Sequence, residues 1–187
     1  MQEKVPAGGL GVSPSFLIVP QDWRQGVESD EWSGWTVRLA VLTDTHAGSM
    51  QGLPRPMLKA LAEVDVIVHA GDFTETAVLE GLRTLGEVEA VCGNMDSRTI
   101  KMTLPRKHVF VAAGRKIGLV HGSGVPLGIA GRVRGEFDDV DIIIFGHSHM
   151  ACNERIRGAL MFNPGRCRDS YGLLTIAEDI STEIVRI

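Results

Sequence analysis

Five short apolar runs recur along the first four fifths of the chain, and each is bounded by glycine or by a polar residue. They span residues 37–42, 66–68, 88–91, 117–120 and 142–145. Short runs rich in β-branched residues and bounded in this way predict buried parallel strands.

The segments between these runs predict helices and hairpins. Residues 53–64 have prolines near their start, where missing N–H groups matter least, and are expected to be helical. Residues 74–85 repeat apolar positions at helical spacing, with Thr74 as the expected N-cap and Gly86 as the C-terminal glycine. Two hairpins are expected, from 108–112 with 116–120 and from 173–177 with 183–187. This order of elements indicates an α/β fold.

Each of the five runs leads into side chains that bind divalent metals. Ligands in open α/β sheets lie beyond the carboxyl ends of the strands. We therefore expect these side chains to form one site. In an extended chain, residues two apart point the same way, so both members of an Asp-x-His or His-x-His pair can reach one centre. The candidate ligands are Asp44, His46, Asp72, Asn94, His121, His147 and His149.

Seven ligands exceed what one tetrahedral ion accepts. They suit two ions about 3.5–4 Å apart that share a carboxylate. Nitrogen and oxygen ligands without a thiolate favour manganese, iron, zinc, cobalt or nickel over magnesium or calcium.

The motif order Asp-x-His, Gly-Asp, Gly-Asn, His-Gly and Gly-His-Ser-His resembles the calcineurin-like metallophosphoesterase superfamily. The short chain, and Asp96 two residues after the Gly-Asn motif, resemble most the YfcE-type phosphodiesterases. Asn163-Pro164-Gly165 fits the same family, and the resemblance covers roughly residues 37–187. It implies two stacked mixed β-sheets flanked by helices, with a dimetal site at the carboxyl ends of the strands.

The resemblance also implies roles for the ligands. The first ion would be held by Asp44, His46, Asp72 and His149, and the second by Asp72, Asn94, His121 and His147. Asp72 would bridge the ions, and Asp72, Asn94 and His121 would form the catalytic group. The implied reaction is hydrolysis of a small phosphodiester by a hydroxide held between the ions. Manganese is the first choice of metal, with nickel, zinc, iron or cobalt as alternatives.

Other polar residues leave alternatives open. Arg166 and Arg168 could clamp a phosphate with their planar guanidinium groups, or could lie in a solvated loop. His69 and His108 have no partner motif and are expected to be structural. Asp96 could support the ligands or be a loop carboxylate.

Two other functions have to be weighed against phosphodiester hydrolysis. The first is a phosphomonoesterase or nucleotide pyrophosphatase. Members of the family with strong monoesterase or nuclease activity carry His where this chain has Met95. The second is a scaffold, as in the retromer subunit of the same fold, which has lost some ligands; here all seven positions are filled.

Composition limits the remaining possibilities. At 187 residues, 44% of them hydrophobic, the chain can bury one full core. The net charge of −4, without a basic face, argues against a stable nucleic-acid complex. No apolar stretch approaches the ~20 residues of a membrane span, so no membrane is expected as a partner. Three cysteines without metal-type spacing indicate reduced thiols and a cytoplasmic location. A homodimer or homotetramer is possible.

The domain is expected to span residues 36–187, with residues 1–35 as an N-terminal extension. The extension lacks periodicity but holds all three tryptophans, Trp23, Trp32 and Trp35. We expect a simple extension; the alternative is an arm whose indoles pack on the domain or on a partner.

Overall fold

The computed structural model describes residues 18–20 and 34–187 of the chain. Its strands are β1 (Ile18–Pro20), β2 (Val37–Leu42), β3 (Val66–His69), β4 (Glu87–Ala90), β5 (Lys107–Ala112), β6 (Arg115–Val120), β7 (Ile142–Phe145), β8 (Cys152–Ile156), β9 (Ala159–Asn163), β10 (Ser170–Ile176) and β11 (Ile180–Arg186). Its helices are the 3₁₀ turn η4 (Met50–Gly52), α1 (Arg55–Leu61), α2 (Thr76–Leu85), α3 (Arg98–Thr103) and α4 (Ile129–Arg134).

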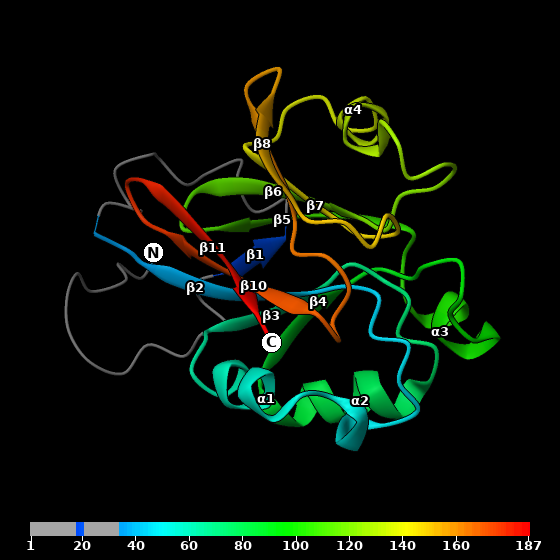
Figure 1. The fold of residues 1–187 in the computed structure, drawn as a ribbon. Helices are drawn as coiled ribbons and strands as arrows, with labels where there is room; N and C mark the ends of the chain where they lie inside the picture. Colours follow the sequence, from blue (N-terminus) through cyan, green and yellow to red (C-terminus); the bar gives the residue numbers. More distant parts are fainter. Residues whose placement is uncertain (1–17, 21–33) are drawn as a thin grey trace, which may run out of the picture.

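The strands form two stacked mixed sheets (Figure 1). One has the order β1-β5-β6-β7-β9-β8, and the other has the order β11-β10-β2-β3-β4. Strands β2, β3 and β4 run parallel in the second sheet, and β6 and β7 run parallel in the first. The five apolar runs are thus parallel strands as predicted, divided three and two between the sheets. The expected αββα architecture is confirmed.

Alternate residues of both sheets form the core between them. Leu39 and Val41 of β2 face this layer together with Leu119 of β6 and Ile144 of β7, and all four are fully buried. A strand buried on both faces needs apolar residues at every position. This explains why these strands appear in the sequence as continuous apolar runs.

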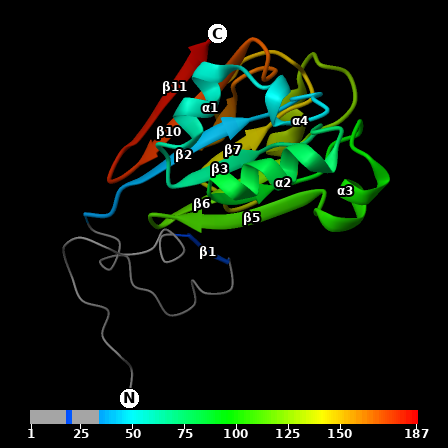
Figure 2. The same ribbon diagram turned by 90° about the horizontal axis from the view of Figure 1, so that it is seen from below.

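Helices cover the two outer faces of the sheets. Helices α1 and α2 pack on the sheet that contains β2 and β3, where Leu42 and Ile67 meet Met57 and Leu82 (Figure 2). Helix α4 packs on the other sheet (Figure 1). No helix in the described part of the chain is long and apolar enough to cross a membrane.

Two predicted helix boundaries were wrong. Of the helix expected at 53–64, only α1 at residues 55–61 forms, with Pro54 as its N-cap, and the separate turn η4 precedes it. Helix α2 begins at Thr76 after Glu75 rather than being capped by Thr74, whose φ of +78° places it in the preceding loop. Gly86 does stand at the C-cap.

Some elements gave no clear signal in the sequence. Helices α3 and α4 have only six residues each, and α3 buries only Ile100. Strand β8 is largely exposed and polar, so it shows neither an apolar run nor an alternation. Its pairing with β9 comes from tertiary context.

The extension contributes to the fold where it is described. Ile18–Pro20 forms the edge strand β1, paired with β5 through Val19 and Val111. Trp35 is half-buried and packs against the core between the sheets, as the arm alternative requires. Trp23 and Trp32 lie outside the described residues.

Candidate metal centre

The loops after five parallel strands bring all seven candidate ligands to one edge of the stacked sheets. Strands β2, β3 and β4 lead to Asp44, His46, Asp72 and Asn94, and strands β6 and β7 lead to His121, His147 and His149. Donor atoms within 4.8 Å of one another define two overlapping groups. These are Asp44, His46 and His149, and Asp44, Asp72 and His121.

Asp44 carries an oxygen without a partner. Its Oδ2 accepts the hydroxyl of Thr43 at 2.7 Å and the N–H of His147 at 3.1 Å. Its Oδ1 is buried and has no hydrogen-bond donor, the single such side-chain atom in the described part of the chain. It lies 3.4 Å from His149 Nε2 and 3.9 Å from His121 Nε2. Because an unsatisfied buried carboxylate oxygen is costly, this atom fits a bound cation.

Asp72 lies between the two groups of imidazoles. Its Oδ2 is 3.2 Å from His121 Nε2 and 4.0 Å from His46 Nε2. Its Oδ1 accepts the N–H of Met95 at 2.7 Å, which fixes the carboxylate plane. Burial by itself raises the pKa of Asp72, but its hydrogen bond and charge interaction with His121 and the Met95 N–H outweigh it and lower the pKa.

His121 directs one nitrogen lone pair into the site. Its Nδ1 lies 2.7 Å from the carbonyl oxygen of Ala70, which can only accept, so Nδ1 carries the proton. In the neutral ring Nε2 is therefore an acceptor, and it faces Asp72. Burial lowers the pKa of His121, but the hydrogen bond to Asp72 and the charges of Asp72 and Asp44 outweigh it and raise the pKa.

His147 is arranged in the same way with its nitrogens reversed. Its Nε2 lies 2.8 Å from the carbonyl oxygen of Gly124, which leaves Nδ1 as the acceptor of the neutral ring. That Nδ1 lies 2.9 Å from Asn94 Oδ1, and His121 Nε2 lies 3.1 Å from the same oxygen. In the neutral rings that metal binding requires, three acceptors thus converge with no proton to share, and a metal ion would satisfy them.

The ligand loops have left-handed backbone at the ligands themselves. Five of the eight non-glycine residues with positive φ in the described chain are candidate ligands, with values from +44° to +67°: Asp44, His46, Asp72, His147 and His149. Asp and His tolerate this region better than most residues, at a cost of about 1–3 kcal/mol each. The prediction that each pair lies in extended chain was therefore wrong. His147 and His149 face different groups, because the turn separates them.

Asp96 holds two of these loops together. The carboxylate is buried and accepts the N–H groups of Gly93 at 2.7 Å, Asp72 at 3.1 Å and Thr74 at 2.9 Å. Of the two possibilities left open by the sequence, the structure favours support of the ligands. With both oxygens occupied, Asp96 acts as an acceptor within the loops.

The His69 side chain supports the loops that carry Asp44, His46 and Asp72. The ring is fully buried, stacks on Phe73 with centroids 3.5 Å apart, and accepts the N–H of Gly71 at Nδ1. Its Nε2 lies 3.3 Å from the hydroxyl of Thr45, between Asp44 and His46. Desolvation by burial lowers the pKa of His69 well below its usual value, so the ring is neutral. Its expected structural role is confirmed.

Sequence reasoning missed the role of Asn163. Its side-chain amide donates to the carbonyl oxygen of Gly146 and to the hydroxyl of Ser148, both at 3.2 Å, so it holds the loop that carries His147 and His149. The Asn-Pro-Gly motif marked the position without giving this function.

Arg166 and Arg168 are not free guanidinium groups, because both lie against the carboxylate of Asp169. Arg166 Nε donates to Asp169 at 2.6 Å, and Arg168 Nε lies 3.6 Å from the same carboxylate. The hydrogen bond from Arg166 lowers the pKa of Asp169. His108 lies elsewhere, with its Nε2 2.9 Å from Glu89.

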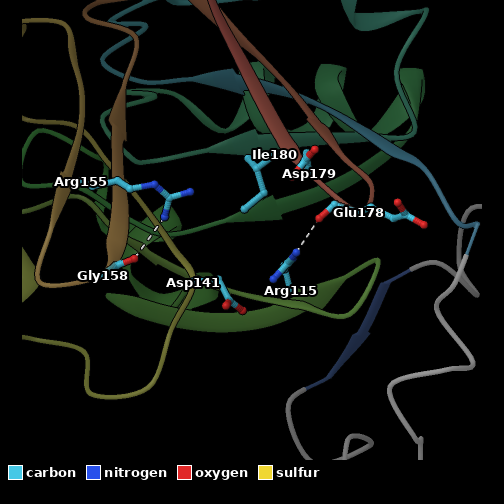
Figure 3. A pocket seen from close by; sticks show the side chains of 7 residues that line it. All are labelled: Arg115, Asp141, Arg155, Gly158, Glu178, Asp179 and Ile180. Carbon is cyan, nitrogen blue, oxygen red and sulfur yellow. Dashed lines mark hydrogen bonds between the residues drawn. The ribbon is translucent and has the colours of Figure 1, made fainter.

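A shallow polar hollow lies at the opposite end of the sheets, where β6 and β7 begin (Figure 3). Arg115 there donates to the carbonyl oxygen of Glu178 at 2.7 Å, and Arg155 to that of Gly158 at 3.2 Å. None of the candidate ligands lines it.

The sequence of this chain is similar to those of known metallophosphoesterases. Residues 37–178 match the calcineurin-like phosphoesterase superfamily domain. A probable metallophosphoesterase of Methanocaldococcus jannaschii is 37% identical over 136 residues, 71% of this chain and 69% of that protein. A probable metallophosphoesterase of Methanothermobacter thermautotrophicus is 34% identical over 79% of this chain and 91% of that protein.

Solved structures show the same fold. A Thermotoga maritima protein aligns with a TM-score of 0.66 and 28% identity, over 81% of this chain and 99% of that one. Wild-type Vps29 from Entamoeba histolytica, solved with zinc, aligns with a TM-score of 0.61 and 25% identity, over 80% and 98% of the two chains. With its motifs, its two sheets and these relatives, the chain belongs to the calcineurin-like phosphoesterase superfamily.

Proposed function

We propose that this chain is a phosphodiesterase that uses two divalent metal ions. The observation that carries the proposal is the convergence of acceptor atoms on one site. Asp44 Oδ1 has no donor, and in the neutral rings His121 Nε2, His147 Nδ1 and Asn94 Oδ1 converge without a shared proton. Bound metal ions would satisfy these acceptors.

Asp44, His46, Asp72 and His149 are proposed to hold one ion, and Asp72, Asn94, His121 and His147 the other. The position of Asp72 Oδ2 between His121 and His46 supports this carboxylate as the bridge. Manganese is the proposed metal, and nickel, zinc, iron and cobalt are alternatives, because imidazole nitrogens and oxygens without a thiolate suit all five. When bound, the ions supply Lewis acidity and lower the pKa of water to about 7.

The protein's own contribution is to hold these groups still. The Ala70 carbonyl fixes the tautomer of His121, and the Gly124 carbonyl fixes that of His147. Such hydrogen bonds orient metal-binding imidazoles and are typically worth 10–100-fold in metal affinity. A diester is favoured as substrate because Met95, beside Asn94, cannot donate a proton to a poor leaving group.

The proposal is tested by reloading the stripped protein with Mn²⁺, Ni²⁺, Zn²⁺ or Mg²⁺ and assaying diesters and monoesters. Metal analysis of Asp72→Ala should show loss at both sites, whereas His149→Ala and Asn94→Ala should each lose about half of the metal. His108→Ala serves as control, because that imidazole pairs with Glu89 away from the site.

Full metal content in Asp72→Ala would contradict the shared carboxylate. Absence of turnover with every metal would indicate a scaffold instead.

A further inference from the structure

Large exposed apolar side chains gather on the loops of the metal centre. The described chain has seven exposed large hydrophobic residues, and four of them lie on ligand loops: Met95, Val125, Leu127 and Met150. Met95 follows Asn94, Met150 follows His149, and Val125 follows Gly124, whose carbonyl contacts His147. Leu127, at 84%, is the most exposed of the seven. Exposed apolar groups gathered at one site mark a binding surface.

The loop that carries Val125 and Leu127 is held in place. Arg132 of α4 donates to the carbonyl oxygens of Leu127 at 2.9 Å, of Ser123 at 3.3 Å and of Val125. The second anchor is the contact between His147 Nε2 and the carbonyl oxygen of Gly124. The backbone of the loop is thus tied both to α4 and to a candidate ligand, which holds the loop beside the site.

The two loops that carry Val125, Leu127 and Met150 have no charged residue of their own. Between His121 and Gly131, and between Gly146 and Asn153, the sequence has no Lys, Arg, Asp or Glu. Two neighbouring cations are occupied by backbone carbonyl oxygens: Arg132 donates to that of Leu127 at 2.9 Å, and Lys101 donates to that of Asn94 at 2.7 Å. Polyanions such as nucleic acids are bound through rows of Lys and Arg, and these loops offer none.

We infer that Val125 and Leu127 bind the uncharged, apolar ester substituent of the phosphodiester, which makes the loop at 123–128 the element that sets substrate preference. The inference rests on the proposed function. The phosphoryl group occupies the metal centre, so the substituent that does not leave has to lie against the loops around it. An aryl or branched alkyl group finds apolar partners there, whereas a charged or sugar substituent does not.

The test compares two phosphodiesters that have the same leaving group and differ in the other substituent. Methyl 4-nitrophenyl phosphate and phenyl 4-nitrophenyl phosphate both release 4-nitrophenolate, so kcat/KM for the two reports the second substituent alone. Leu127→Ser should lower the phenyl-to-methyl ratio of kcat/KM about tenfold, the lower range for loss of an apolar contact in a substrate pocket. Val125→Ser should act in the same direction.

Leu85→Ser is the matched control. Leu85 is also an exposed leucine, at 41%, but it ends α2 at the far end of β4 from Asn94. The phenyl-to-methyl ratio of kcat/KM in Leu85→Ser should equal that of the wild type. Binding gives a second readout: calorimetry on the manganese-loaded protein should show phenylphosphonate losing affinity in Leu127→Ser while methylphosphonate changes much less.

The outcomes separate the two proposals. An unchanged phenyl-to-methyl ratio and unchanged phenylphosphonate binding in Leu127→Ser would overturn the inference and assign these side chains to a macromolecular partner. Equal losses for both esters would also overturn it, because they would indicate a structural role. Absence of turnover of either ester by the loaded wild type would instead refute the proposed phosphodiesterase.

Discussion

Asp96 accepts the backbone N–H of Asp72, 3.1 Å from its Oδ2, and so positions the carboxylate proposed to bridge the ions. The same oxygen accepts the N–H of Gly93, and Oδ1 accepts that of Thr74. Asp96→Asn keeps the size of the side chain but replaces one of the two accepting oxygens with an amide NH₂ group. The backbone N–H groups on that side then have no acceptor. We expect metal affinity to fall about 10–100-fold and stability by about 1–3 kcal/mol, measured by metal titration and urea unfolding.

Asp141→Asn is the control for this prediction. Asp141 also accepts a backbone N–H, from half-buried Lys116 at 2.7 Å, but it precedes β7 at the end remote from the ligands. The Asp141→Asn protein should lose some stability and keep its metal affinity. Equal metal affinities in the two variants would show that Asp96 contributes to folding alone.

Gly146→Ala should disturb the first metal position. A Cβ at this residue would lie 1.9 Å from Thr43 Oγ1 and 3.1 Å from Asp44 Oδ2, so Thr43 and its bond to Asp44 have to move. We expect a loss of about 1–3 kcal/mol and weaker metal binding. Gly131→Ala, which has open space in α4, should instead gain up to about 1 kcal/mol. Unchanged metal content in Gly146→Ala would show that the loop adapts.

The metal-free protein should lose stability in acid through His69. Its folded pKa is lowered, so below about pH 6.5 the unfolded chain binds a proton that the folded chain does not. Stability is therefore lost as the pH falls from about 6.5, by at most about 1.4 kcal/mol per pH unit from this group. His69→Asn should unfold more easily at every pH but with a shallower dependence. Urea unfolding at about pH 5 and about pH 7.5 measures the difference in slope, and equal slopes would count against this origin.

Met95→His should narrow the gap between good and poor leaving groups. Met95 is exposed beside Asn94, and its thioether cannot donate a proton. A general acid is typically worth ~10²–10⁴-fold, and poor leaving groups need it most. We expect the wild type to cleave aryl diesters better than alkyl monoesters, with a smaller gap in the variant. A wild type that prefers alkyl monoesters would show that another acid operates, and Asp96 is a poor candidate because N–H donors occupy both its oxygens.

Trp35 should contribute to stability although it belongs to the expected extension. Its indole packs half-buried against the core between the sheets. Trp35→Ala should therefore lower the free energy of unfolding by about 1–2 kcal/mol, with little change in turnover. Truncation to a chain beginning at Gly34 keeps this contact and should keep turnover. An unchanged melting temperature in Trp35→Ala would support a passive extension.

The sequence by itself determined the five parallel strands and named the candidate ligands. A strand such as β7, buried on both faces, has to be apolar throughout, so Ile142–Phe145 was predicted with its observed bounds. The polar residues stood out because side chains that can bind a metal follow all five runs. The family resemblance added the two sheets.

Only the tertiary structure decided how the ligands are arranged. Spacing alone placed His147 and His149 on one centre, and the resemblance divided them between two ions. Positive φ at both residues is what turns His147 toward Asn94 and His149 toward Asp44. The support from Asp96 and Asn163 joins loops far apart in the chain, and no local pattern records such bonds. Local periodicity fixes which residues are buried, whereas the direction of a ligand depends on backbone strain and long-range hydrogen bonds that form only when both sheets are stacked.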